Sequence, residues 1–145
     1  MRMSPAFLSL TLIAVASDMV HARLQEAAPA PGGERVIVFF AWDRPIVDGD
    51  AAAQLDAVAA AVQRSPNVRL DLSGHADRSG PAASNVRSGR ERAEAVAAYL
   101  VAHGVPGAAM KVVSHGESRP LIPTQDGVRE PQNRRVEIVM TRAPG

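Results

Sequence analysis

The spacing of apolar side chains predicts four strands in residues 35–142. A continuous apolar run at residues 36–40 is typical of a strand buried on both faces, and we expect this strand to be central in its sheet. Apolar and polar side chains alternate over residues 68–72, which predicts a second strand with one buried face. Further strands are predicted at residues 110–114 and 135–140.

Two helical stripes of apolar residues lie between these strands. The first has the i, i+3, i+4, i+7 spacing of one helical face: Leu55, Val58, Ala59 and Val62. Asp48 or Asp50 could cap its N-terminus, and residues 65–67 should end it. The second stripe repeats the spacing: Ala93, Val96, Ala97 and Leu100. It predicts a helix over residues 83–103, followed by Gly104 in the left-handed conformation.

The order of these elements predicts the fold class. An order β-α-β-α-β-loop-β favours an α/β (α+β) two-layer sandwich, with a mixed sheet and both helices on one face. Strands linked through helices should be parallel, and the last strand should be antiparallel to its neighbour. The loop at residues 116–133 is rich in Pro and Gly and longer than most, which favours a functional role.

Composition narrows the class of protein. The chain has 145 residues, of which 46% are hydrophobic and 21% charged, as in a single globular domain. A net charge of +1 and an aromatic content of 3% argue against nucleic acid as a partner. Because the chain has no cysteine, disulfides, thiol catalysis and a diacylated cysteine anchor are excluded.

The first 34 residues have the pattern of an export signal and a leader. Arg2 precedes an apolar run at residues 6–16, which is shorter than the roughly 20 residues that span a bilayer. Small residues around Ala22 suit cleavage there, so residues 1–22 are predicted to be a secretory signal peptide. The alternative is a buried N-terminal helix or an uncleaved anchor. Residues 23–34 are predicted to be a flexible leader, and the mature chain is expected in the periplasm without a membrane span of its own.

Polar residues gather where the second strand ends. Residues 73–80 hold Asp77 at a strand-to-helix turn, and Asn85 and Arg92 share one side of the following helix. A carboxylate and a guanidinium on opposite walls of a cleft could receive a zwitterion, with its ammonium on Asp77 and its carboxylate on Arg92. Spacing alone favours the alternative that Asp77 and Arg92 form a salt bridge, or that Asp77 caps the turn.

Five ordered motifs resemble the OmpA-like peptidoglycan-binding domain, which OmpA, Pal and MotB share. They are Gly74-His75-Ala76-Asp77-x-x-Gly80, Asn85, Arg92-Ala93-x-x-Val96, Gly116-Glu117-x-x-Pro120 and Asn133-Arg134-Arg135-Val136-Glu137-Ile138. The resemblance implies non-covalent binding of the peptidoglycan stem peptide, whose diaminopimelate Asp77 and Arg92 would clasp. In that family an aromatic or apolar residue and an Asp or Asn at this place contact the same ligand, which implies this role for Trp42 and Asp43, although Trp42 could instead be a core or rim residue. No cofactor is expected.

The sequence also departs from the pattern of that family. Ala76 replaces the usual Thr, Ser88-Gly89 replaces the usual Leu-Ser, and His115 stands where Tyr is common. We expect Gly89 to be exposed in its helix and to destabilise it by roughly 1 kcal/mol relative to Ala.

Other interpretations have less support in the sequence. His75, Asp77 and His115 could be drawn together as a metal site, but their spacing matches no compact metal motif. No Gly-x-Ser-x-Gly pattern accompanies Ser79, so an enzyme is not expected. Arg134 and Arg135 could bind an anion, although an ion pair with Glu117 or Asp71 is favoured, with one arginine pointing inward and the other to solvent.

A different class of function remains open. The same fold could serve as a periplasmic adaptor that binds another envelope protein, with weak or lost affinity for peptidoglycan. Any association with the outer membrane would then require such a partner.

Overall fold

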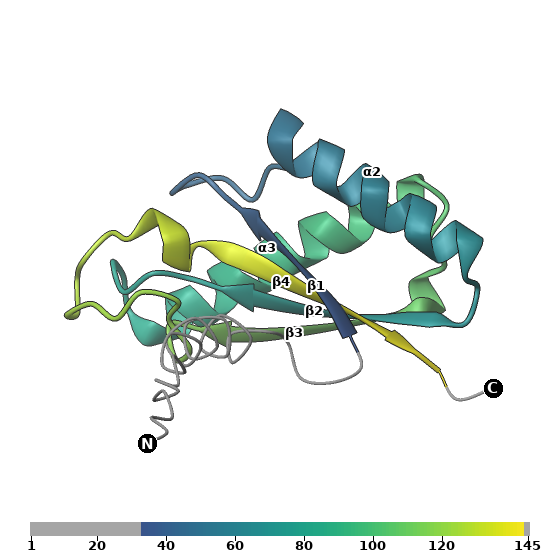
Figure 1. The fold of residues 1–145 in the computed structure, drawn as a ribbon. Helices are drawn as coiled ribbons and strands as arrows, with labels where there is room; N and C mark the ends of the chain where they lie inside the picture. Colours follow the sequence, from purple (N-terminus) through teal and green to yellow (C-terminus); the bar gives the residue numbers. More distant parts are fainter. Residues whose placement is uncertain (1–32, 144–145) are drawn as a thin grey trace, which may run out of the picture. The chain divides into compact units, whose positions relative to one another are not determined.

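A four-stranded sheet carries two helices on one face in the computed structural model, which describes residues 33–143 (Figure 1). The elements in chain order are β1 (Gly33–Phe39), α2 (Gly49–Arg64), β2 (Val68–His75), α3 (Ala82–Ala102), β3 (Met110–Gly116) and β4 (Arg135–Arg142). Two short 3-10 helices, η1 (Gly107–Ala109) and η2 (Pro131–Asn133), precede the last two strands. The predicted two-layer α/β fold is confirmed.

The strand order is β1-β4-β2-β3, so the last strand inserts between the first two. β4 is antiparallel to both neighbours, while β2 and β3 are parallel, as expected. The prediction that β1 is central is wrong, because β1 forms an edge of the sheet. Its apolar run does not reflect burial on both faces: Val38 is buried under the helices, whereas Phe39 is 46% exposed on the opposite face.

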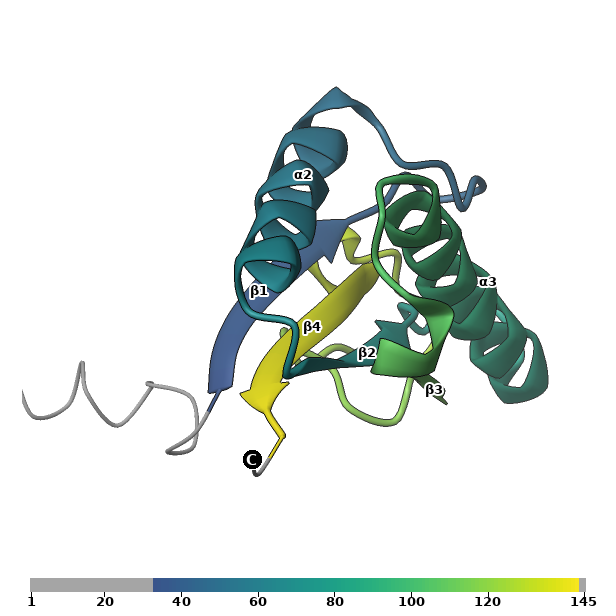
Figure 2. The ribbon, with the colours of Figure 1, turned by 90° about the vertical axis from the view of Figure 1, so that its right-hand side faces the viewer.

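Both helices pack on the same side of the sheet, as Figure 2 shows. The predicted stripe of α2 is buried, and Asp48 is its N-cap, accepting a hydrogen bond from the Ala51 N–H at 2.9 Å. In α3, Ala93, Val96 and Leu100 are buried, and Gly104 follows with a φ of 92°. These residues and the inward side chains of β2 and β4 form one core.

α3 crosses β2 at two glycines. A Cβ on Gly74 would lie 1.8 Å from the Gly89 carbonyl oxygen, and a Cβ on Gly89 would lie 2.5 Å from Ser114 Oγ. Gly89 is therefore buried, and the expectation that it is exposed is wrong. The close approach brings the N-terminal half of α3, which contains Asn85 and Arg92, against the end of β2.

None of the helices within residues 33–143 is long and apolar enough to cross a bilayer. The predicted signal peptide at residues 1–22 and nearly all of the leader at residues 23–34 lie outside the described residues.

Candidate functional site

A cavity of about 200 Å³ lies where β2 ends, between the loop after β1 and the N-terminal half of α3. All five residues that the sequence analysis selected line it: Trp42, Asp43, Asp77, Asn85 and Arg92. The remaining lining residues are small and mostly polar: Ala76, Ser79, Gly80, Ser84 and Ser88. Such a cavity fits a small polar group rather than an extended apolar ligand.

Asp77 is held at the floor of this cavity by four donors. Its Oδ1 accepts hydrogen bonds from the Ser79 N–H at 3.1 Å and the Ser79 hydroxyl at 2.5 Å. Its Oδ2 accepts from Arg134 Nη1 at 3.0 Å and from the Glu130 N–H at 3.3 Å. Burial acts to raise the pKa of Asp77, but the hydrogen bonds from Ser79 and Arg134 outweigh it, and the pKa lies below its usual value. The carboxylate is therefore ionised at neutral pH.

Arg92 lies on the adjacent wall and is bound to the backbone of two other segments. Its Nη1 donates to the His75 carbonyl at 2.9 Å, and its Nη2 donates to the Trp42 carbonyl at 3.3 Å. These bonds use only part of the five N–H donors of a guanidinium. Burial, and then the charge of Arg134, lower the pKa of Arg92. An arginine nevertheless stays charged at neutral pH.

The two residues do not pair with each other. Of the ion pairs within residues 33–143, none joins Asp77 to Arg92. Asp77 does cap its turn, through the Ser79 N–H, as one of the alternatives predicted. Asp77 and Arg92 are only 3% and 5% exposed, yet both border the cavity, so a ligand there would meet them from one side.

The cation that pairs with Asp77 is Arg134, which the sequence analysis assigned to other partners. The expected ion pairs with Glu117 or Asp71 do not form: Arg134 binds Asp77, and Arg135 binds Glu137 at 2.9 Å. Both arginines are buried, so the expectation that one points to solvent is wrong. Arg134 immediately precedes β4 and Arg135 is its first residue, and each pairs with a different carboxylate.

Trp42 and Asp43 form the rim of the cavity. Trp42 is 47% exposed, its Nε1 donates to Ser79 Oγ at 3.3 Å, and the Arg129 guanidinium lies 3.8 Å from the centre of its ring. Asp43 is exposed next to it. The rim therefore adds a second carboxylate that is open to solvent.

Asn85 supports the turn from the first part of α3. Its Nδ2 donates to the Gly80 carbonyl at 2.9 Å and to Glu117 Oε2 at 2.8 Å. Both amide hydrogens are thus used within the protein, leaving the Oδ1 atom as the group Asn85 could offer to a ligand.

Sequence reasoning missed Ser79, Glu130 and Arg134 as contacts of Asp77. Ser79 stands inside the turn and could have been found from the tendency of Asp to bond two residues ahead. Arg134 and Glu130 lie more than fifty positions from Asp77, and no local spacing connects them to it.

The three residues considered for a metal site have different contacts. The His75 and His115 rings lie 5.4 Å apart, whereas Asp77 bonds to Ser79 and Arg134. Within residues 33–143, no group of three or more metal-ligating side chains could hold an ion. Burial, with the charge of Arg135, lowers the pKa of His75 to about 4.

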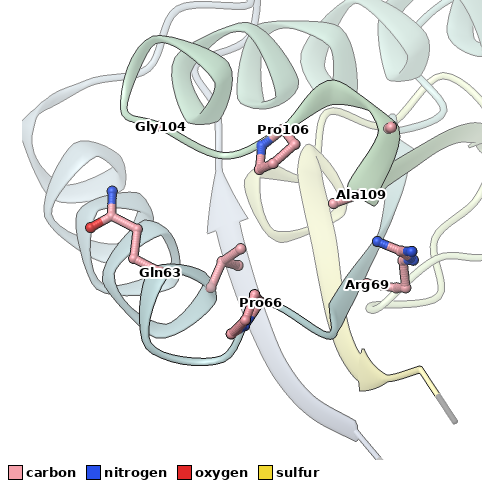
Figure 3. A pocket seen from close by; sticks show the side chains of 8 residues that line it. Gln63, Pro66, Arg69, Gly104, Pro106 and Ala109 are labelled. Atoms are coloured by element: carbon pink, nitrogen blue, oxygen red, sulfur yellow. The ribbon is translucent and has the colours of Figure 1, made fainter. Parts of the chain in front are cut away.

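A second cavity lies at the other end of the helices and lacks the chemistry for a zwitterion. Figure 3 shows this cavity of about 260 Å³, with Gln63 on α2, Arg69 on β2 and Gly104 after α3 around it. Its lining includes the guanidinium of Arg69 but no carboxylate. Of these two cavities, the first is therefore the one lined by both carboxylate and guanidinium groups.

Comparison with known proteins gives consistent matches. Residues 39–134 match the model of the OmpA family. The chain is 42% identical over 122 residues to an outer membrane protein of Gluconacetobacter diazotrophicus, covering 78% of this chain but only 31% of that protein. It is 37% identical over 131 residues to a peptidoglycan-associated lipoprotein of Rhizobium meliloti, covering 86% of this chain and 74% of the relative.

Solved structures agree in fold. The peptidoglycan-associated lipoprotein of Burkholderia pseudomallei superposes with a TM-score of 0.68 at 31% identity, covering 72% of this chain and 89% of that one. A C-terminal domain of Helicobacter pylori MotB gives a TM-score of 0.65 at 21% identity, over 74% of this chain and 85% of that one.

Proposed function

The chain belongs to the OmpA family, and from this premise we propose that it binds peptidoglycan non-covalently and thereby tethers a component of the bacterial envelope. Relatives named peptidoglycan-associated lipoprotein support the ligand class. The observation that carries the proposal is the cavity that both Asp77 and Arg92 line.

The charges at this cavity suit a ligand with both signs. Asp43, Asp77 and Arg92 line the cavity, and Arg134 pairs with Asp77 from outside the lining, so carboxylate and guanidinium groups face a ligand together. A simple anion or cation would leave one of these charges uncompensated, whereas a zwitterion matches both. The free end of diaminopimelate in a stem peptide carries one ammonium and one carboxylate.

The contacts of Asp77 and Arg92 support a proposal for how that end would bind. Its carboxylate takes the unused N–H donors of Arg92 in a charge-assisted contact. Its ammonium reaches Asp77 by replacing the Glu130 N–H, whose 3.3 Å bond is the longest of the four, and Asp43 faces the same ligand from the rim. Two such contacts, each stabilising by about 1.5–3 kcal/mol before the cost of immobilisation, give a modest affinity that repeated sites on a polymer increase.

Localisation follows from the same proposal. A peptidoglycan ligand requires export, which the predicted signal peptide at residues 1–22 would provide. We place the mature chain in the periplasm, associated with the outer membrane through a partner.

One observation favours an adaptor as the second candidate. Phe39 and Ile46 are 46% and 58% exposed, and a further cavity of about 480 Å³ is lined by Phe39, Phe40, Ala41 and Pro131 together with Asp48 and Gln132. An exposed apolar area of this kind could receive another envelope protein.

Sedimentation with purified diaminopimelate-containing sacculi separates the two candidates. Wild type should co-sediment, Asp77→Asn and Arg92→Gln should remain in the supernatant, and free diaminopimelate should compete. Arg69→Gln is the matched control, because Arg69 lines the other cavity, and it should co-sediment like wild type. Co-sedimentation that neither site variant changes would contradict the proposal and favour the adaptor.

A further inference from the structure

We propose that Arg134 is a positioning residue of the stem-peptide site, which holds the Asp77 carboxylate in the orientation and charge state that the ligand meets. The proposal rests on the proposed function for its ligand, but its central contact, the Arg134–Asp77 ion pair, can be tested without one. Arg134 does not itself line the cavity.

Arg134 connects the segments that build the cavity. Its Nη1 donates to Asp77 Oδ2 at 3.0 Å, and its Nε donates to the Phe40 carbonyl at 3.3 Å. Its own backbone carbonyl accepts from the Phe40 N–H at 2.9 Å. This one residue, immediately before β4, therefore fixes the turn after β2 relative to the end of β1, which Trp42 and Asp43 follow.

The ion pair offsets the cost of burying the carboxylate. Asp77 is 3% exposed, and desolvation of this kind favours the neutral acid. Ser79 and Arg134 provide the contacts that keep the carboxylate ionised. Without Arg134, we expect burial to shift the pKa of Asp77 upward, and a neutral carboxyl would no longer attract an ammonium.

The neighbouring Arg135 provides a matched control. It is also buried, and it also pairs with a carboxylate, Glu137, at 2.9 Å. Its side chain, however, makes its contacts away from the cavity, to Glu137 and to the carbonyls of Asn133 and Arg119. Removal of either arginine deletes one buried ion pair, but only removal of Arg134 affects Asp77.

The first measurement is calorimetric titration of the full chain with a diaminopimelate-containing stem tripeptide. Arg134→Met should weaken binding by about tenfold or more, as expected when a bond to a charged group is lost. Arg134→Lys should restore part of this affinity, because lysine keeps the charge but cannot bond Asp77 and Phe40 together. Arg135→Met should bind within twofold of wild type.

A double-variant cycle tests whether Arg134 acts through Asp77. In an Asp77→Asn background, Arg134→Met should cause no further loss of affinity, because the carboxylate it positions is already gone. An equal loss in both backgrounds would mean that Arg134 contacts the ligand directly and would overturn the proposal. Wild-type affinity in Arg134→Met would overturn it as well.

A ligand-free measurement separates this proposal from the proposed function. Carbon NMR titration of the Asp77 side chain should give a higher pKa in Arg134→Met than in wild type, with no change in Arg135→Met. If wild type fails to bind the tripeptide, the proposed function fails, and this titration still decides whether Arg134 controls Asp77. An unchanged Asp77 pKa would refute the proposal. If Arg134→Met does not fold, Arg134→Lys serves the same test, and the pKa of Asp77 should then rise by a smaller amount.

Discussion

His75 is a buried histidine whose ring makes no hydrogen bond, while its backbone carbonyl binds a residue of the site. It is 2% exposed, and neither ring nitrogen has a hydrogen-bond partner within the described residues. Its carbonyl accepts the bond from Arg92. Around the ring lie Arg135, Glu137, His115 and Arg119, and burial, with the charge of Arg135, depresses its pKa to about 4. The folded protein therefore holds His75 neutral.

This burial predicts that stability falls as the pH falls below neutral. Between the unfolded pKa of 6.5 and the folded pKa of about 4, His75 binds more protons in the unfolded chain than in the folded one. The contribution of His75 to stability is therefore fully present above pH 6.5 and is lost as the pH falls toward 4. From pH 7 to pH 5 the loss from His75 should be about 2 kcal/mol. His115, whose pKa is also lowered, adds to it in the same direction.

Urea denaturation at pH 7, 6 and 5 measures this dependence. His75→Gln should remove most of the pH dependence of the free energy of unfolding over this range. An unchanged slope in His75→Gln would show that His75 is not held neutral.

At the scale of elements, the glycine crossing of α3 and β2 sets the position of the site. The close contact of Gly74 with Gly89 brings Arg92 within reach of the His75 carbonyl. Gly74→Ala should destabilise the fold by about 3 kcal/mol or more, because its Cβ would meet backbone, which cannot move aside.

Gly89→Ala should lower the free energy of unfolding by less than Gly74→Ala does. It gains helix propensity of roughly 1 kcal/mol, and its main clash is with the hydroxyl of Ser114. Adding Ser114→Ala should recover part of the loss. Gly49→Ala is the control, since a Cβ there meets no atom within 4 Å, and it should not destabilise. Thermal unfolding compares the variants, and a Gly74→Ala protein as stable as wild type would contradict this packing.

Local pattern predicted the elements but not all of their neighbours. The stripes of α2 and α3 and the alternation in β2 are properties of adjacent residues, so their positions could be predicted within a few residues. The edge position of β1 could not, because it depends on β4 inserting between β1 and β2 from almost a hundred residues away. The Arg134–Asp77 pair was missed for the same reason.

At the scale of the whole molecule, the proposed function depends on one cavity that side chains of both charges line. The five expected site residues border it, although Asp77 and Arg92 reach it by separate networks rather than as a direct pair. A ligand that lacks one of the two charges should therefore bind much less tightly.

Titration of the chain with two stem tripeptides, identical except for diaminopimelate or lysine at the third position, tests this most directly. Lysine keeps the ammonium but lacks the carboxylate that Arg92 would bind, so the diaminopimelate peptide should bind about tenfold or more tightly. Arg92→Gln should remove the difference. Equal affinity of wild type for both peptides would contradict the account.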